Sequence, residues 1–271
     1  MDILKRSLAP IFPAAWDEID EQAKTVLKGV LAGRKVVDVT GPLGWNCDSV
    51  SEGTLSLVEE SPVEDVSYGI RESLPLIEIR VPFTMSMWDL DDISRNSKTV
   101  DFTPVIEAAH KAALFEDTAI FLGLEEAGIL GMELEADNDP IELKLEDESI
   151  LESIVEGMTT LNSRSMEGPY ALVCTLPLWT KIKTSAKGYP LLKRVKDALG
   201  DDCRIVLSPQ YETSMLVSAK EGNSELIIGQ DFSIGYQSHT NTDVSFYITE
   251  TFTFRVIAPE SIVPFKIAGK K

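Results

Sequence analysis

The sequence predicts an α+β fold built from one unusually long β-strand, several amphipathic helices and a projecting hairpin. Residues 244–257 alternate almost cleanly between apolar and mainly polar side chains, and only Glu250 interrupts the apolar side. A period of two is the pattern of a β-strand. At about 3.4 Å per residue this run spans roughly 45 Å, well beyond the usual strand of about five or six residues. A strand of this length favours a long, flat protomer over a compact enzyme core.

The first predicted element is an amphipathic helix over residues 16–31, with Gly33 where a C-terminal cap is expected. Its apolar residues recur at helical spacing and are Trp16, Ile19, Ala23, Val26, Leu27, Val30 and Leu31. Beyond the helix, residues 35–40 form a short β-rich run, and residues 41–45 form a turn rich in glycine and proline.

Residues 51–74 contain two extended runs, 54–58 and 66–71, which are separated by the acidic, proline-containing segment 59–65. This order predicts a long projecting hairpin. The hairpin has few large apolar residues, so it would bury little surface within its own chain. We therefore expect it to pack against a neighbouring copy of the protein.

Two further β-rich segments, 76–83 and 84–90, precede a long predicted helix over residues 103–122. Thr103 and Pro104 suit its N-cap and its first helical position, and a glycine follows its last residue. The side expected to be buried carries Val105, Ile106, Ala109, Ala112, Ala113, Glu116 and Ile120.

The segment 135–220 is predicted to be an α/β insertion between the β-rich parts of the chain. Helices are expected at residues 150–161, 177–185 and 191–199, and strands at residues 170–176, 204–207 and 215–219. A strand at 226–228 and the long strand then return the chain to the first domain.

The composition points to a soluble intracellular protein that binds neither nucleic acid nor membranes. Forty-four acidic residues against 25 basic ones give a net charge of −19, which repels phosphate backbones and anionic lipids. The three cysteines are far apart and lack metal-ligand spacing, so neither a disulfide framework nor a zinc site is expected. The sequence shows no signal-peptide pattern and no stretch of about 20 apolar residues. We expect a cytoplasmic protein.

Catalytic motifs are absent from the sequence. Only two histidines occur, and there is no nucleophile elbow, Cys-x-x-Cys, Walker loop or Gly-x-Gly-x-x-Gly. The adjacent carboxylates Glu116 and Asp117 could form a catalytic dyad or could be ion-paired, and we favour ion pairing because neighbours on a helix point about 100° apart. Glu250 is expected to have a basic partner across the sheet or across a subunit boundary. We predict no catalytic residue, no metal site and no enzymatic activity.

Short motifs occur in order along nearly the whole chain. They are Leu4-Lys5-Arg6 with Ala9-Pro10, Trp16 with Ile19-Asp20, Gly33-Arg34-Lys35 with Val37-Asp38-Val39, Gly41-Pro42 with Gly44-Trp45, Ser73-Leu74-Pro75-Leu76-Ile77-Glu78, Phe115-Glu116-Asp117 with Ile120-Phe121, Glu167-Gly168-Pro169-Tyr170, Gly229-Gln230-Asp231 with Ser233-Ile234-Gly235-Tyr236, and residues 248–254. Together they resemble the encapsulin family of bacterial nanocompartment shell proteins, which share the fold of tailed-phage major capsid proteins.

The resemblance implies a capsid-like protomer with three parts. A peripheral domain, which includes the N-terminal helix, would comprise residues 1–48, 76–134 and 221–271. An extended hairpin arm would comprise residues 49–75, and an axial domain residues 135–220. Copies of such a protomer would self-assemble into a closed icosahedral shell, of about sixty copies in the smallest case.

The function implied by the resemblance is to enclose a cargo enzyme, a dye-decolorising peroxidase or a ferritin-like protein, by binding a targeting peptide at the cargo's C-terminus. By resemblance, Leu27, Leu31, Arg34 and Asp38 dock this peptide, although ordinary core packing is an equal alternative for the two leucines. Replacing Arg34 or Asp38 by alanine is expected to leave shells intact and to lower cargo loading.

Two further sites are implied by the resemblance. The loop 185–190, with Lys187, Gly188 and Tyr189, would line a pore on the fivefold axis; its alternative is an ordinary turn between helices. Trp88, with Arg80 on the preceding strand, would offer a platform for a flavin, although we favour core or interface packing for the tryptophan. No cofactor is required.

Two other functions stay open at the level of sequence. A protease or bacteriocin-like enzyme is one, because encapsulin relatives have carried such labels, but the sequence offers no pair of nucleophile and base. A genuine phage capsid protein that packages nucleic acid is the other, and the negative net charge argues against it.

Overall fold

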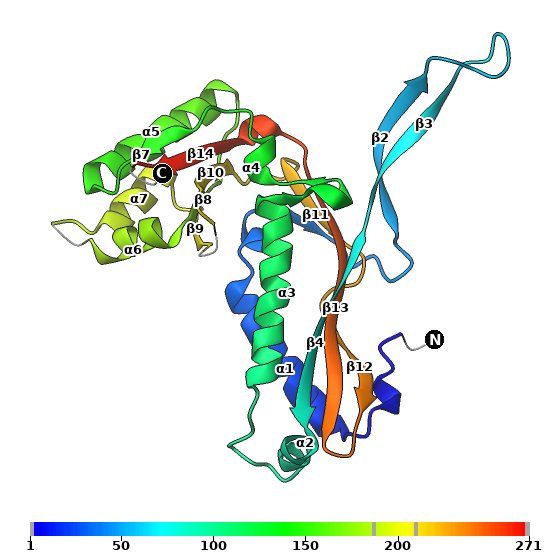
Figure 1. Cartoon of the computed structure of the whole chain (residues 1–271). Coiled ribbons are helices and arrows are strands. Elements are labelled where there is room, and N and C mark those ends of the chain that lie inside the picture. The colour runs from blue at the N-terminus through cyan, green and yellow to red at the C-terminus, as the bar shows by residue number, and fades with distance from the viewer. Residues whose placement is uncertain (1–2, 186–187, 209–210, 269–271) are drawn as a thin grey trace.

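The computed structural model describes residues 3–185, 188–208 and 211–268. The molecule has three parts (Figure 1): an elongated body built on a sheet, a smaller helix-covered sheet at one end of the body, and a hairpin that projects away from both. The architecture contains helices and strands in separate layers, as the predicted α+β class requires.

The body is organised around β13 (Asp243–Val256). β4 (Ile77–Ser86) pairs antiparallel with β13 along one side, from Asp243 opposite Ser86 to Phe252 opposite Ile77. On the other side, β12 (Ser233–His239) and β11 (Ser224–Ile228) follow one another along β13, and β1 (Asp38–Thr40) pairs parallel with β11. The long strand is therefore the shared element of the whole sheet.

Helices α1 (Pro13–Val30) and α3 (Thr103–Phe121) pack on each other and on the sheet (Figure 1). Phe246 of β13 meets Trp16 of α1 edge to face and stacks on Phe83 of β4, with 5.3 Å between ring centroids in both pairs. Such aromatic pairs add to the free energy gained by burying apolar surface.

Both faces of β13 are buried, whereas its sequence predicts one mainly polar face. Thr249, Thr251 and Thr253 lie on the predicted polar side and are all buried. The chain that follows β11 covers Thr251: its hydroxyl accepts a hydrogen bond from the Gln230 amide at 2.7 Å, and a side chain at Gly229 would meet Thr251 Oγ1 at 2.5 Å. The alternation of side chains along a strand does not reveal whether a distant segment covers its polar face, and such covering explains why the predicted polar face is buried.

Three predicted boundaries are wrong, each for a local reason. The β-rich segment 84–90 is interrupted because the Ser86 hydroxyl accepts a hydrogen bond from the Trp88 amide and starts α2 (Met87–Ser94). The strand predicted at 170–176 ends at Cys174, because Leu176 and Pro177 start the next helix. Gly33 does not cap α1; it begins the short 3₁₀ helix η2 (Gly33–Lys35), where a side chain would collide with Ile120 at 2.4 Å.

The second sheet has the strand order β7 (Ile141–Leu143), β14 (Ile262–Ile267), β10 (Ser214–Ser218), β8 (Tyr170–Cys174) and β9 (Arg204–Leu207). Helices α5 (Asp147–Ser163), α6 (Leu176–Thr184) and α7 (Leu191–Leu199) pack against it around a separate apolar cluster. We call this sheet with its three helices the axial unit. Because β14 pairs with β10 and β7, the last strand belongs to the axial unit, and its predicted placement in the peripheral domain with residues 221–271 is wrong.

Small elements connect these parts. They are η1 (Arg6–Leu8), β5 (Gly123–Leu124), η3 (Glu125–Ala127), β6 (Ile129–Leu130), α4 (Met132–Glu135) and η4 (Pro259–Ser261). Gly123, at the predicted stop of the long helix, has φ +89° and lies so close to the Gly131 backbone that a side chain would approach its nitrogen to 2.6 Å. Glycine is required there by both conformation and space.

The projecting hairpin is formed by β2 (Ser49–Val58) and β3 (Tyr68–Pro75), so the hairpin predicted at 51–74 is present. Opposite pairs in its register are Leu57 with Gly69 and Ser56 with Ile70, which places Leu57 and Ile70 on opposite faces. Their exposed fractions are 75% and 61%. The arm thus presents uncovered apolar side chains on both faces, and none of the described parts of its own chain buries them.

Candidate functional site

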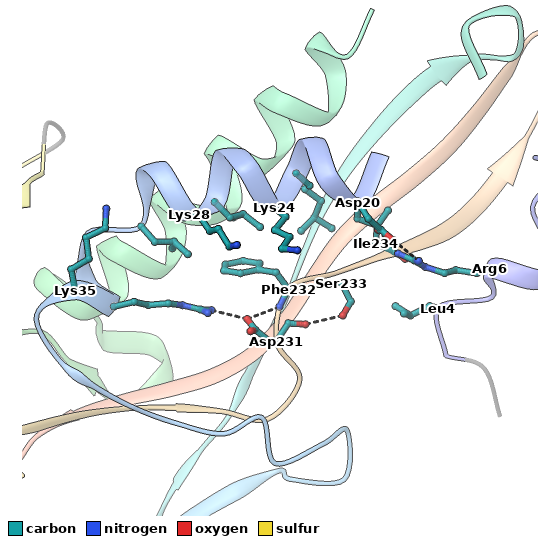
Figure 2. Close-up of a pocket in the computed structure, with 15 residues that line it drawn as sticks. Leu4, Arg6, Asp20, Lys24, Lys28, Lys35, Asp231, Phe232, Ser233 and Ile234 are labelled. Carbon is teal, nitrogen blue, oxygen red and sulfur yellow. Dashed lines mark hydrogen bonds and ion pairs between the residues drawn. The ribbon is translucent and has the colours of Figure 1, made fainter. Parts of the chain in front are cut away.

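A groove of about 720 Å³ lies between α1 and the chain that enters β12. Its apolar lining comes from Ala23, Leu27 and Leu31 on α1, from Phe232 and Ile234 at β12, and from Ile248 on β13. Figure 2 shows the groove running between α1 and the segment 231–234, with Leu4 and Arg6 at one end and Lys35 at the other.

The rim of the groove is mainly basic, although the protein carries a net charge of −19. The basic side chains that line it are Arg6, Lys24, Lys28, Arg34 and Lys35. Arg6 is engaged by Asp20 at 2.6 Å and lies 4.4 Å from the centroid of Trp16. An apolar floor with charged groups at its edge suits an extended peptide, whose side chains enter the floor while its polar backbone meets the rim.

The structure brings together three of the four residues predicted to dock a peptide. Leu27 and Leu31 line the groove and are also nearly fully buried. Both leucines therefore pack in the core and form part of the groove lining at the same time. Arg34 lies at the groove edge. Asp38 does not line the groove: it is on β1, and its carboxylate accepts a hydrogen bond from the Gly222 amide at 2.6 Å.

Arg34 is the centre of a charged network beneath the groove. Its Nη2 lies 2.6 Å from Glu116 Oε2, 2.6 Å from Glu250 Oε1 and 2.9 Å from Asp231 Oδ1. Glu116 and Glu250 are fully buried, whereas Asp231 is partly exposed in the groove wall. The expectation that Glu116 is ion-paired is confirmed, and the basic partner expected for Glu250 lies within the same protomer.

The two buried carboxylates set the electrostatics of this network. Burial alone would lower the pKa of the Arg34 guanidinium, but hydrogen bonds to Glu116 and the charges of Glu116 and Glu250 raise that pKa overall. Burial also raises the pKa of Glu250 well above its ordinary value, and the nearby Glu116 raises it further, while Arg34 lowers it. Arg34 is therefore needed to keep two acidic side chains in the apolar core.

Asp117 holds the chain immediately after α1. Its carboxylate accepts hydrogen bonds from the amides of Ala32, at 3.0 and 3.1 Å, and of Gly33, at 2.7 Å. Burial raises the pKa of Asp117 to about 7, although the two backbone amides counteract part of this rise. The paired carboxylates Glu116 and Asp117 thus have structural roles: one binds Arg34, and the other fixes the backbone that presents it.

Several groove residues were missed at the level of sequence. Phe232 packs under Arg34, with 4.9 Å between the guanidinium carbon and the ring centroid, and Ile234 is hydrogen-bonded through its carbonyl to Arg6. These residues are about 200 positions away from α1 in the chain, so no local pattern joins them. Lys24 and Lys28, four residues apart beside Leu27 and Leu31, were the one local signal of a basic rim.

The predicted pore loop is only partly described. Lys187 lies outside the described residues. Gly188 has φ +75° and, like Tyr189, is exposed. The loop joins α6 to α7 at the far end of the axial unit (Figure 1), and its position on a symmetry axis stays a prediction.

The residues of the predicted flavin platform do not meet. Trp88 is on α2 with 70% of its surface exposed, which makes core packing within the protomer wrong. Arg80 lies on β4 six residues before the end of that strand, or roughly 20 Å away at strand spacing. Its guanidinium packs over Tyr247 at 4.9 Å. Arg80 and Trp88 of one protomer therefore do not form a single platform, and flavin binding at Trp88 with Arg80 stays a prediction.

Chemistry-bearing side chains do not gather elsewhere in the described residues. No group of three or more histidine, cysteine, aspartate or glutamate side chains in residues 3–185, 188–208 and 211–268 could hold a metal ion. In the same ranges no helix is both long and apolar enough to cross a membrane. His239 lies 2.5 Å from the Tyr236 hydroxyl in the β12–β13 turn, with no second acid–base group bonded to it among the described residues.

Comparison with solved structures shows the fold. The chain superimposes on a virus-like particle protein from Pyrococcus furiosus with a TM-score of 0.65, covering 93% of this chain and 99% of the other at 16% identity. It also superimposes on a protein of Mycobacterium phage Bobi with a TM-score of 0.58, covering 89% and 91% at 11% identity. The predicted capsid-like fold is confirmed.

Comparison with characterised proteins shows the family. A family model described as encapsulating protein for peroxidase matches residues 1–253. The type 1 encapsulin shell protein of Rhodospirillum rubrum is 37% identical over 98% of this chain and 97% of the relative. Those of Brevibacterium linens and Mycobacterium tuberculosis are each 36% identical, over 98% and 97% of this chain and 100% and 98% of the relatives. The chain belongs to the encapsulin family and is a capsid-like shell protein of a nanocompartment.

Proposed function

We propose that the shell formed by this protein loads a cargo enzyme by binding a peptide at the cargo's C-terminus in the groove beneath α1. The observation that carries this proposal is the groove itself: about 720 Å³ with a mainly apolar lining on a strongly charged protein. Exposed apolar concavities of this size are typical of ligand sites rather than of solvated surface. Leu27 and Leu31 supply the floor, and Arg34 and Phe232 supply one wall.

The cargo is a peroxidase or a ferritin-like protein in this proposal. The description of the matching family model, encapsulating protein for peroxidase, supports the first of these. About sixty copies would make the smallest closed shell, located in the cytoplasm. Small solutes would enter through a pore lined by the loop that contains Gly188 and Tyr189, since a closed shell needs an entry route for the cargo's substrates.

The test starts by identifying proteins that co-purify with the native shell by mass spectrometry. The last residues of the identified cargo are then fused to a fluorescent protein and co-expressed with shell variants. Phe232→Ala is expected to leave particles intact and to lower the fluorescence per particle at least about tenfold. Phe232 is partly buried in the free protein, and an interface aromatic that a bound peptide covers contributes about 2 kcal/mol or more to binding.

Phe12→Ala is the matched control, because Phe12 is an exposed phenylalanine that does not line the groove. This variant is expected to load like the wild type. If Phe232→Ala particles load normally, or if both variants lose loading equally, the cargo peptide binds elsewhere on the shell.

A further inference from the structure

The helical layer of the axial unit has an acidic side and a basic side. Helix α7 contacts both α5 and α6, so α5 and α6 lie at opposite edges of the layer (Figure 1). The exposed charged residues in the middle and first turn of α5 are Glu148, Glu152 and Glu156. The exposed lysines are Lys183 on α6 and Lys193 and Lys196 on the middle helix α7, and they outnumber the one exposed acidic residue of these two helices, Asp197. One protomer therefore carries two surfaces of opposite charge.

The acidic side also contains an apolar hollow. A depression of about 580 Å³ is lined by Leu151 and Val155 together with the three glutamates, and 51% of the Val155 surface is exposed. Arg194 of α7 also lines it, but this arginine is paired with Glu148, so Glu152 and Glu156 leave the hollow acidic. A lysine side chain fits this chemistry well, because its methylene chain covers apolar surface while its ammonium group reaches a carboxylate at the edge. The hollow therefore favours a basic, amphipathic occupant.

Contacts within the protomer already pair these two sets of helices. Arg194 of α7 binds Glu148 at 2.8 Å, and Lys181 of α6 binds Asp147 at 2.7 Å. The other exposed charged side chains on these helices do not take part in such ion pairs. In the described part of the chain, Glu152, Glu156 and Lys196 make no ion pair, and Lys193 packs 5.8 Å from the centroid of Tyr189. These unpaired groups are available to another molecule.

We propose that the α5 face of one protomer, centred on Glu152, Val155 and Glu156, binds the α6–α7 face of a neighbouring copy through Lys193 and Lys196. A symmetric contact of α5 with α5 would place glutamates against glutamates and is disfavoured by repulsion. The complementary contact is head to tail, and head-to-tail contacts close into rings when the rotation between copies permits. This inference rests on assembly of the protein into a shell and names the surfaces that join its axial units.

Charge reversal tests the contact in the full-length protein. Glu152→Lys with Glu156→Lys, and separately Lys193→Glu with Lys196→Glu, are each expected to lower the fraction of protein in shell-sized particles at least about tenfold at low ionic strength. Size-exclusion chromatography and negative-stain microscopy measure this fraction. The variant with all four substitutions restores opposite charges across the contact and is expected to recover assembly.

Three controls separate the contact from general effects. Circular dichroism and the thermal midpoint show whether each variant folds, and the exposed positions should leave both unchanged. Glu152→Gln with Glu156→Gln removes charge without reversing it and is expected to give an intermediate loss. Salt at about 0.5 M shortens the screening length and should weaken the defect of each reversal. Folded reversal variants that assemble like the wild type, or a fourfold variant that assembles no better than either pair, would overturn the proposal.

Discussion

The arm and the body each contain a long antiparallel strand pair, yet the two pairs are stabilised in opposite ways. β2 of the arm and β4 of the body have the same length, ten residues each. β4 pairs with β13 under α1 and α3, and alternate residues along it are buried. No residue of β2 or β3 is buried. An isolated two-stranded hairpin is only marginally stable in water, so the arm depends on neighbours in a way that the body does not.

The difference between the arm and the body shows which part of the protein needs neighbouring copies for its stability. The body completes its core with its own helices and even pairs its buried charges internally, as the Arg34 network shows. The arm leaves Leu57 and Ile70 exposed on opposite faces. Burial of such side chains contributes about 1.5–3 kcal/mol each, and in the arm this gain is available only between copies. Changes in the body should therefore affect folding, and changes in the arm should affect assembly.

The largest expected effect is in the body. Arg34→Ala removes the cation that contacts both Glu116 and Glu250, and it leaves these two buried acidic side chains without that partner. We expect the free energy of unfolding to fall by about 3–5 kcal/mol. Urea denaturation followed by tryptophan fluorescence, at one fixed protein concentration, measures this loss. The sequence-based expectation that this substitution spares the shell and lowers only loading does not take account of the network.

Arg34→Lys provides the matched variant for this experiment. Lysine keeps the charge but cannot reproduce the forked contacts of a guanidinium with several carboxylates. An unfolding free energy between those of the wild type and Arg34→Ala is expected. If Arg34→Ala unfolds at the wild-type urea concentration and only loading falls, Arg34 acts in peptide binding rather than in the core.

The second effect is in the arm. Leu57→Ser is expected to weaken each contact between copies by about 1.5–3 kcal/mol, and the loss is repeated at every arm in a shell. The body should be unaffected, with its unfolding free energy changed by about 0.5 kcal/mol or less. Particle yield by size-exclusion chromatography and urea denaturation of the unassembled fraction measure the two quantities separately.

Ile70→Ser extends the same experiment to the opposite face of the arm. Loss of assembly in both variants would show that both faces are covered in the shell. Particles that form normally from Leu57→Ser, or a body destabilised as much as the particle, would contradict the contrast between arm and body.

The sequence predicts much of this contrast, because the signals are local. The alternation in residues 244–257 and the helical spacing in residues 16–31 report the elements of the body directly. The arm is predicted by an acidic turn that separates two extended runs with few large apolar residues. The covering of the polar face of β13 and the return of β14 to the axial unit depend on contacts between distant segments, and alternation carries no information about these.

The candidate site was predictable only in part for the same reason. Leu27, Leu31 and Arg34 belong to one helix and the turn after it, so a family motif places them together. Ile234 belongs to β12, and Phe232 immediately precedes that strand. Asp38 follows Arg34 closely in sequence, yet β1 carries it away from the groove to the Gly222 amide. Proximity along the chain therefore does not decide which side chains share the groove.

The third prediction concerns pH and the junction between α1 and α3. Burial raises the pKa of Asp117 to about 7, above its ordinary value near 3.8, so the folded protein binds this proton more tightly than the unfolded chain does. The contribution of this group to stability is complete below about pH 4 and is lost as pH rises towards 7. The expected slope is at most about 1.4 kcal/mol per pH unit. Asp117→Asn should reduce this slope, measured by urea denaturation from about pH 4 to pH 8.

Glu250 contributes to the pH dependence of stability with the same sign as Asp117, since burial raises its pKa as well. The matched variant Glu250→Gln therefore separates the two groups. The double variant should show the flattest dependence of stability on pH. An unchanged slope in Asp117→Asn would mean that the Asp117 carboxylate keeps its ordinary affinity for the proton, and that its hydrogen bonds to Ala32 and Gly33 outweigh burial.

The smallest effect is expected at Asp38, at the edge of the body. Asp38→Ala removes one hydrogen bond to the Gly222 amide, and we expect the unfolding free energy to fall by about 0.5–1.5 kcal/mol. Because Asp38 does not line the groove, cargo loading per particle should match the wild type, whereas Phe232→Ala should lower it. Fluorescence per particle with the tagged cargo measures this difference. If Asp38→Ala particles are intact but poorly loaded, the bound peptide extends past Arg34 to β1, and the docking surface is longer than the groove of one protomer.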